Sequence, residues 1–170
     1  MHMHQSRDRA TYLLGIPKRM SQPSAQVDLA ACHCTALRKA ARQLSILYDR
    51  YLSPAGLTNG QFAILTQLAT WPSGTNPSVA DLARALVLDR TALTRALRPL
   101  VRDGLLQLAQ SSQDQRVRLV RLTGTGRKRL AEASGLWAQA QDKYAQAVGE
   151  RQAVALRALS QIVAEAELGE

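Results

Sequence analysis

Few aromatic residues, two cysteines and no long apolar run characterise this 170-residue sequence. Seven aromatic side chains and a scarcity of β-branched runs favour a mainly helical fold. Cys32 and Cys34 are separated by one residue and cannot form a relaxed disulfide within a helix, which excludes a secreted disulfide scaffold. No apolar stretch approaches the ~20 residues that span a membrane, and residues 12–16 are too short for a signal-peptide core. We therefore expect a cytoplasmic protein with no membrane partner.

The usual signatures of catalysis and cofactor binding are also missing. The three histidines are all N-terminal, and two of them, His2 and His4, lie in a segment without sustained periodicity. The sequence has no glycine-rich phosphate loop, zinc-ligand spacing or serine triad context. We expect no cofactor and no metal site, and a small enzyme remains only a remote alternative.

The net charge is +9, and it is unevenly distributed. Residues 1–59 sum to +5, residues 60–123 to +4, and residues 124–170 to zero. All eight basic residues of the central segment are arginine, the side chain that makes bidentate contacts with bases and phosphates. A GC-rich genome that favours arginine codons would give the same enrichment. We interpret the distribution as a sign of a polyanionic partner on one side only.

The most informative stretch is LDRTALTRALRPLVRDGLL, residues 88–106. On a helix, its apolar side chains fall on one side and its arginines and threonines on the other. Arginine and threonine hydrogen-bond base edges in the major groove, and Asp89 is placed to cap the first helical turn. The pattern predicts a DNA recognition helix. Its expected DNA-contacting residues are Arg90, Thr91, Thr94, Arg95, Arg98 and Arg102.

A helix face of this kind is also typical of a plain solvated surface, so the flanking sequence decides between the two interpretations. Ser78 and Asp81 form an N-cap signal for a short helix that ends near Leu86, just before Asp89. Two short helices joined this tightly form a helix-turn-helix. Pro99 removes one backbone hydrogen bond, and we expect it to kink the second helix after two turns.

After Gly104 the periodicity changes from helical to alternating. Residues 105–109 and 117–122 flank a polar tip that contains Arg116. This pattern predicts a β-hairpin with a basic tip. A plain structural ribbon is the alternative, but a hairpin directly after a helix-turn-helix is the wing of a winged helix.

Long amphipathic helices are expected towards both ends of the chain, at residues 29–52, 123–148 and 150–168. A capping box formed by Thr58 and Gln61 follows the first of them. Because a small winged helix cannot cover all their apolar stripes, we expect these helices to pack against one another and against a second copy. The predicted organisation is a flexible basic arm at 1–27, a helical dimerisation region at 28–57 and 124–170, and a winged helix-turn-helix DNA-binding domain at 58–123.

The chain resembles the MarR family of bacterial transcriptional regulators over about residues 30–168. The resemblance is carried by the first two helices, by LDRTALTRALRPLVRDGL in the recognition helix and by DQRVRLVRLTGTG at the wing. It implies a homodimer that binds a pseudo-palindromic operator in double-stranded DNA, usually as a repressor that a small ligand releases. It also implies that Asp114 braces Arg116, which enters the minor groove.

For the signal, the resemblance favours a small aromatic or phenolic acid. Such an effector would bind between the dimerisation helices and the DNA-binding domain. Arg42, Tyr48 and Phe62 are the residues we expect in the wall of its pocket.

A thiol-based peroxide sensor is the alternative. Cys34 lies at the start of the first helix, where backbone N–H groups and Arg38 favour a thiolate. This segment also resembles the peroxide-sensing branch of the family, and Tyr48 matches one of the tyrosines of that branch. Arg38 and Asn59 stand where its other tyrosines would be, so the hydrogen-bonding cage is incomplete.

Overall fold

The computed structural model describes residues 28–166, which fall into two units, residues 1–43 and residues 44–170, described separately below. The predicted N-terminal arm lies outside the described residues. In the first unit, a 3-10 helix, Leu29–Ala31, precedes helix α1, His33–Leu52, which continues into the second unit. The predicted α-helix from residue 29 was wrong at its start. Cys32 is the junction, because its N–H closes the 3-10 turn while its carbonyl oxygen accepts the first α-helical hydrogen bond.

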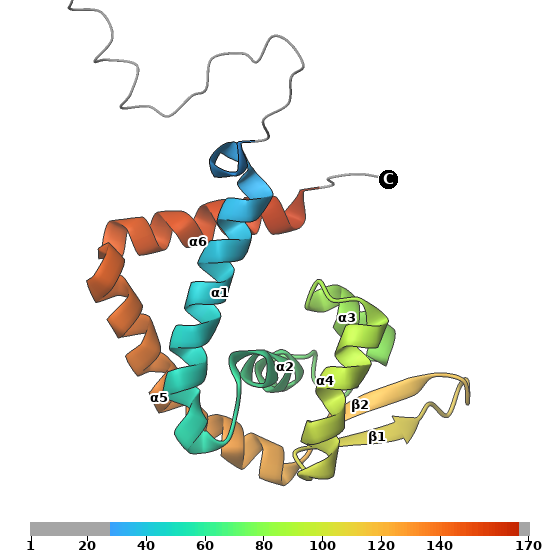
Figure 1. Ribbon diagram of the computed structural model, residues 1–170. Helices are drawn as coiled ribbons and strands as arrows, with labels where there is room; N and C mark the ends of the chain where they lie inside the picture. The colour runs from blue at the N-terminus through green and yellow to red at the C-terminus, as the bar shows by residue number, and fades with distance from the viewer. Residues whose placement is uncertain (1–27, 167–170) are drawn as a thin grey trace, which may run out of the picture. The chain divides into compact units, whose positions relative to one another are not determined.

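The second unit is mostly helical (Figure 1). Helix α1 is followed by a 3-10 turn (Ser53–Ala55) and by the helices α2 (Asn59–Ala69), α3 (Val79–Ala85) and α4 (Arg90–Arg102). The strands β1 (Leu106–Gln110) and β2 (Arg118–Leu122) come next, and the helices α5 (Gly124–Val148) and α6 (Glu150–Glu165) complete the unit. This arrangement confirms the predicted mainly helical winged-helix fold with a small β-wing. The last helix was predicted too long, because the backbone is already extended at Ala166 (φ −70°, ψ 131°). No described helix is long and apolar enough to cross a membrane.

The helices of the winged helix begin at the capping residues that the sequence predicts. The Thr58 hydroxyl accepts a hydrogen bond from the N–H of Gln61, whose side chain accepts one from the N–H of Thr58. Ser78 and Asp81 form the same reciprocal pair before α3. Before α4, the Asp89 carboxylate accepts a hydrogen bond of 2.8 Å from the N–H three residues along the chain. Each cap stabilises its helix by about 1 kcal/mol, so the starts of these helices are set by local sequence.

Helices α3 and α4 form a helix-turn-helix around a shared leucine core. Three leucines of this core are at most 1% exposed: Leu82, Leu93 and Leu100. In the turn, the Leu88 N–H donates to the Ala83 carbonyl oxygen, and Val87 has a φ of 52°. A positive φ is unfavourable for a β-branched residue, so packing of the leucines imposes this turn. Helix α4 continues through Pro99, and the kink expected there stays a prediction.

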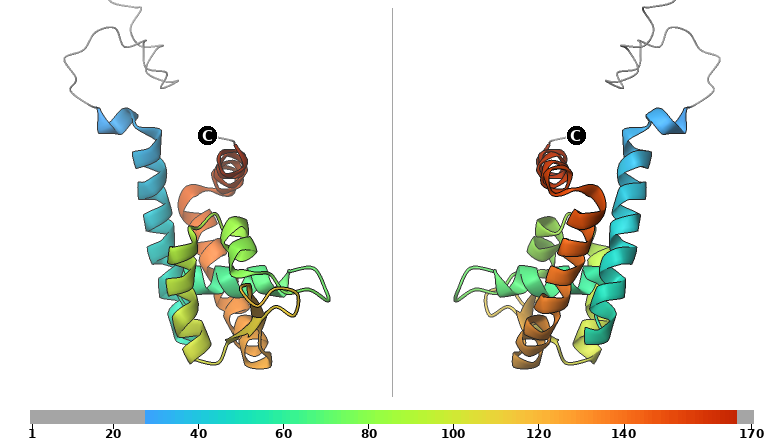
Figure 2. Two further views of the ribbon diagram at one scale, coloured as in Figure 1. Left: turned by 90° about the vertical axis from the view of Figure 1, so that its right-hand side faces the viewer. Right: turned by 90° about the vertical axis from the view of Figure 1, so that its left-hand side faces the viewer.

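The hairpin of β1 and β2 is tied to the helix-turn-helix by its second strand. The Val120 N–H donates to the Pro77 carbonyl oxygen at 2.9 Å, and Leu119 pairs with Ser78 in an isolated β-bridge. Because Ser78 caps α3, the base of the wing and the start of the helix-turn-helix are joined directly. Figure 2 shows the hairpin and the turn between α2 and α3 extending to the same side.

Helix α5 begins in close contact with the base of the wing. The Thr123 hydroxyl donates to the Gly104 carbonyl oxygen at 2.8 Å and accepts from the Gly126 N–H at 2.9 Å. A Cβ atom at Gly126 would overlap the Leu105 carbonyl oxygen and lie 2.7 Å from Leu122 Cδ1. Only glycine therefore fits at this contact.

We predict that Gly126→Ala destabilises the protein by about 1–3 kcal/mol, because the added methyl group must displace backbone. Gly135→Ala is the matched control in the same helix, where nothing in the chain lies within 4 Å of the new Cβ atom. There the higher helix propensity of alanine should stabilise the protein by about 0.5–1 kcal/mol. Urea unfolding followed by circular dichroism measures both. Equal effects of the two substitutions would contradict the tight contact.

Helix α6 exposes a row of large apolar side chains. Gly149, with a φ of 91°, ends α5 and lets the chain turn into α6. On one side of α6, the exposed fraction is 61% for Leu159, 64% for Ile162 and 43% for Val163. Scattered exposed apolar residues are normal, but a contiguous apolar helix face in a monomer is typical of an interaction surface.

Candidate nucleic-acid interface

The solvent-facing side of α4 carries all six residues predicted to contact DNA. Each of them is exposed: Arg90, Thr91, Thr94, Arg95, Arg98 and Arg102. On the opposite side Leu93, Leu97 and Leu100 are at most 3% exposed, which fixes the rotation of the helix about its axis. The result is a rigid helix whose outward face carries four guanidinium groups and no carboxylate.

The arginines of this face differ in their surroundings. Arg102 Nε lies 2.8 Å from Asp103 Oδ1. This hydrogen-bonded ion pair raises the pKa of the Arg102 guanidinium and lowers the pKa of the Asp103 carboxyl. Arg90, Arg95 and Arg98 have no ion pair within the described part of the chain. They are therefore free to bind bases or phosphates, whereas Arg102 must first break its ion pair with Asp103.

Thr94 is held by its own helix. Its hydroxyl donates to the Arg90 carbonyl oxygen at 2.7 Å. The hydroxyl oxygen remains available only as an acceptor, and the methyl group is the apolar part of the side chain. Such a threonine suits contact with a thymine methyl group or with an amino group on a base edge.

The tip of the wing is an ordered turn. The Asp114 carboxylate accepts a hydrogen bond of 2.8 Å from the backbone N–H of Arg116, and the Ser111 hydroxyl accepts from two further N–H groups of the tip. Asp114 therefore braces the backbone of Arg116, and the Arg116 guanidinium has no ion pair among the described residues. A free arginine on an ordered tip is suited to a minor groove or a phosphate.

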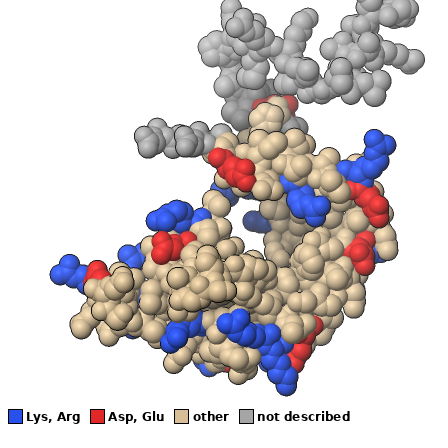
Figure 3. All heavy atoms as spheres, turned by 180° about the vertical axis from the view of Figure 1, so that it is seen from behind, with Lys and Arg blue, Asp and Glu red and all other residues tan. Residues whose placement is uncertain are grey.

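Basic side chains outnumber acidic ones around the wing and the beginning of α5 (Figure 3). The first turns of α5 contribute Arg127, Lys128 and Arg129, and no acidic residue lies in the first turn. None of these three residues was among those predicted to contact DNA. The run Arg-Lys-Arg was the available signal, but it falls in a segment whose total charge is zero.

A cavity of about 710 Å³ lies between α6, α5 and the second half of α1, and no residue of α4 or of the wing lines it. Tyr48, one of the predicted pocket residues, lines it, and its hydroxyl donates to the Gln141 side-chain oxygen. Burial raises the pKa of the Tyr48 hydroxyl, and the neighbouring Tyr144 adds to this effect. Tyr48 is therefore a neutral phenol in the wall of the cavity.

The other two predicted pocket residues are placed differently. Phe62 does not line the cavity, but its ring stacks on Trp137, which does, with ring centroids 6.1 Å apart. Arg42 belongs to the first unit and is not among the lining residues. The cation that lines the cavity is instead Arg157 of α6, which sequence analysis missed because helical periodicity gives no sign of which residues on α6 face α5.

The two cysteines of the first unit are free thiols, and they differ in environment. Cys34, the residue singled out from the sequence, is exposed. Cys32, at the junction before α1, accepts hydrogen bonds from the Thr35 hydroxyl and the Thr35 backbone N–H, which lower the pKa of its thiol. Of the two thiols, Cys32 has the surroundings that favour a thiolate.

Comparison with known proteins agrees with this geometry. The sequence model of the MarR family matches residues 57–117, the part that holds the helix-turn-helix and most of the wing. The transcriptional activatory protein BadR of Rhodopseudomonas palustris is 34% identical over 103 residues, which are 61% of this chain and 59% of BadR. This chain thus spans less than two thirds of that relative.

Two solved structures cover more of the chain. The transcriptional regulator MosR of M. tuberculosis in complex with DNA is 34% identical, with a TM-score of 0.64 over 79% of this chain and 99% of that one. The PcaV regulator of Streptomyces coelicolor in complex with its natural ligand is 25% identical, with a TM-score of 0.69 over 84% of this chain and 99% of that one.

Proposed function

This chain belongs to the MarR family of DNA-binding transcriptional regulators, and from that premise we propose that it is a homodimeric repressor that a small aromatic acid releases from its operator. The observation that best supports this proposal is the exposed face of α4, which carries arginines without ion pairs on a helix whose start is fixed by the Asp89 cap. A helix N-terminus held in this way presents its first turns to a major groove. The wing, with Arg116 at its tip, supplies a second contact to the neighbouring groove. We propose no catalytic activity.

The proposed dimer needs a surface on which a second copy of this chain can pack. The apolar row on α6, which includes Leu159 and Ile162, is exposed in the single chain. A two-fold axis between two recognition helices would place them on successive turns of one face of the duplex, ~34–36 Å apart. The operator should therefore be pseudo-palindromic.

Selection of duplexes from a random pool tests this function directly. We expect enrichment of a pseudo-palindrome whose half-sites are centred about one helical turn apart. Affinity for the selected duplex should fall by about 10³–10⁵ between 50 and 200 mM salt, as for 6–10 phosphate contacts. Enrichment of single half-sites, or a flat salt dependence, would contradict dimeric binding through the arginine face.

The proposed effector is an aromatic or phenolic acid. The support from this chain is the cavity next to Tyr48, whose wall contains the phenol of Tyr48, the indole of Trp137 and the guanidinium of Arg157. Because Trp137 stacks on Phe62 of α2, an occupant of the cavity would contact a side chain joined to the first helix of the winged helix. PcaV, a related regulator of known structure, binds its natural ligand.

Thiol-based sensing is a second candidate, favoured by the hydrogen bonds to Cys32. A hydroperoxide would transfer one oxygen atom to a thiolate, giving a sulfenic acid and an alcohol. If sensing occurs, Cys32→Ser should keep DNA binding and lose its response to hydroperoxide, because it removes the thiol whose pKa the Thr35 hydrogen bonds lower. Cys34→Ser is the matched variant, and anisotropy on the operator is the measurement. A wild-type response lost only in Cys34→Ser would assign the role to Cys34, and equal responses in all three proteins would exclude both thiols.

A further inference from the structure

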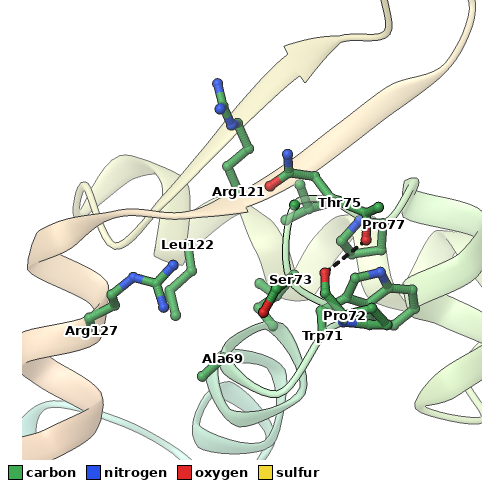
Figure 4. A pocket seen from close by; sticks show the side chains of 13 residues that line it. Ala69, Trp71, Pro72, Ser73, Thr75, Pro77, Arg121, Leu122 and Arg127 are labelled. Atoms are coloured by element: carbon green, nitrogen blue, oxygen red, sulfur yellow. Dashed lines mark hydrogen bonds between the residues drawn. The ribbon is translucent and has the colours of Figure 1, made fainter.

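A second, smaller cavity of about 340 Å³ lies at the base of the wing. Its walls are the turn between α2 and α3, strand β2 and the first turn of α5 (Figure 4). It belongs to the DNA-binding part of the chain and shares no lining residue with the cavity next to Tyr48. Neither the recognition helix nor the wing tip lines it.

The charged residues that line this cavity are all basic. Two arginines, Arg121 of β2 and Arg127 of α5, line it together with no acidic residue. Neither guanidinium has an ion pair within the described range of the chain. In Figure 4, Arg127 reaches past Leu122 towards the turn, and Arg121 stands at the edge and points away from the floor. By contrast, the cavity next to Tyr48 has Arg157 together with Asp142 and Glu150.

The rest of the lining is mainly polar. Its apolar part is small, because Leu68 is 7% exposed and Val120 is fully buried. The rim carries the indole of Trp71, the hydroxyl of Ser73 and the amide of Asn76 as hydrogen-bond donors. A small polar anion would place its charge at the arginines and its other polar groups at this rim.

The walls of the cavity are held in place by hydrogen bonds. Thr75 donates from both its N–H and its hydroxyl to the Pro72 carbonyl oxygen, at 3.3 and 2.9 Å, which closes the turn. The Val120 N–H donates to the Pro77 carbonyl oxygen and fixes the turn against β2. Because these bonds join protein atoms to one another, the walls are preorganised and ligand binding costs little ordering entropy.

We propose that this cavity binds a small polar carboxylate, with the carboxylate on Arg127 and its other polar groups at the rim. The site is separate from the effector site proposed above. Its test uses DNA-free protein, so its failure leaves the repressor proposal unaffected, and the reverse also holds.

The two tryptophans of the chain report on the two cavities separately, because Trp71 lines the smaller one and Trp137 the larger one. In Trp137→Phe, which keeps Trp71, 4-hydroxybenzoate should change the tryptophan emission saturably, and the uncharged 4-hydroxybenzamide should not. Arg127→Gln in this background should weaken binding about tenfold, as expected for the loss of one charge-assisted hydrogen-bonded pair. Arg118→Gln, on strand β2 but outside the cavity, should leave binding unchanged.

Trp71→Phe is the matched control. The ligand absorbs the same amount of light in this sample, but the only remaining tryptophan is Trp137. Calorimetry on the wild type and on Arg127→Gln repeats the comparison without altering either tryptophan. A saturable change only in Trp71→Phe would move the ligand to the larger cavity and overturn the proposal. It would also be overturned by equal binding of the amide, by unchanged affinity in Arg127→Gln, or by the absence of saturable binding.

Discussion

Replacing Leu159 and Ile162 together by lysine is expected to give a monomer that binds the operator about 10²–10⁴-fold more weakly than the wild type. Both side chains are more than 60% exposed on the same side of α6. A buried lysine without a partner is strongly unfavourable, so the second copy should dissociate. Each monomer then brings one recognition helix to the duplex and loses the effective concentration that the partner provides. The added positive charge would by itself strengthen DNA binding, so a loss must come from the dimer.

Gln161→Lys is the control for this double variant. It adds a lysine away from this row, at a position where the Gln161 side chain donates a hydrogen bond to Glu165 one turn further along α6. Light scattering should give a dimer for the control and a monomer for the double variant, and anisotropy should show near wild-type affinity only for the control. A dimer mass for the double variant would mean that the exposed row on α6 is not the interface.

Arg95→Ala should weaken binding to the operator by about 1–3 kcal/mol per half-site, and twice that for a dimer on two half-sites. Arg95 follows the capped start of α4 by less than two turns and has no competing ion pair in the described chain. It should therefore contact a base edge, and its loss should relax sequence preference at one position per half-site. Random DNA should be affected much less.

Arg116→Ala should act differently, because a wing tip reaches a minor groove or a phosphate but not a major-groove edge. We expect weaker binding to all sequences and a salt slope reduced by about one per wing. Both variants are measured on operator and on random duplex across a salt series, with Arg151→Ala of α6 as the control arginine. If Arg95→Ala weakens both duplexes equally while Arg116→Ala abolishes discrimination, the two roles are reversed.

The features that sequence predicted well are those specified by residues close together in the chain. The caps at Thr58, Ser78 and Asp89 each join residues three apart, so they can be read from the sequence without knowledge of the fold. The two faces of α4 follow from the helical period alone. The hairpin was predicted from its alternating pattern next to a polar tip.

Features that depend on tertiary packing or on side-chain rotamers were not predicted. The ion pair of Arg102 with Asp103 is a choice among rotamers that periodicity does not describe. The cavity at the base of the wing joins residues about 50 positions apart, such as Trp71 and Arg121. The surroundings of Cys32 depend on the start of α1, which lies at His33 and not at the predicted residue 29, and the boundaries of helices are the least certain part of any sequence pattern.

The left-handed Val87 between α3 and α4 has a consequence for how this regulator responds to heat and to mutation. The turn is held by buried Leu82 and Leu93 against the conformational preference of a β-branched residue. Loosening of that core would let the turn relax and tilt the recognition helix out of register with the groove. Conservative core substitutions such as Leu82→Val should therefore produce temperature-sensitive gene control, with DNA affinity lost at temperatures below global melting. Adaptation of such a regulator to a new growth temperature would then proceed through residues that never contact DNA.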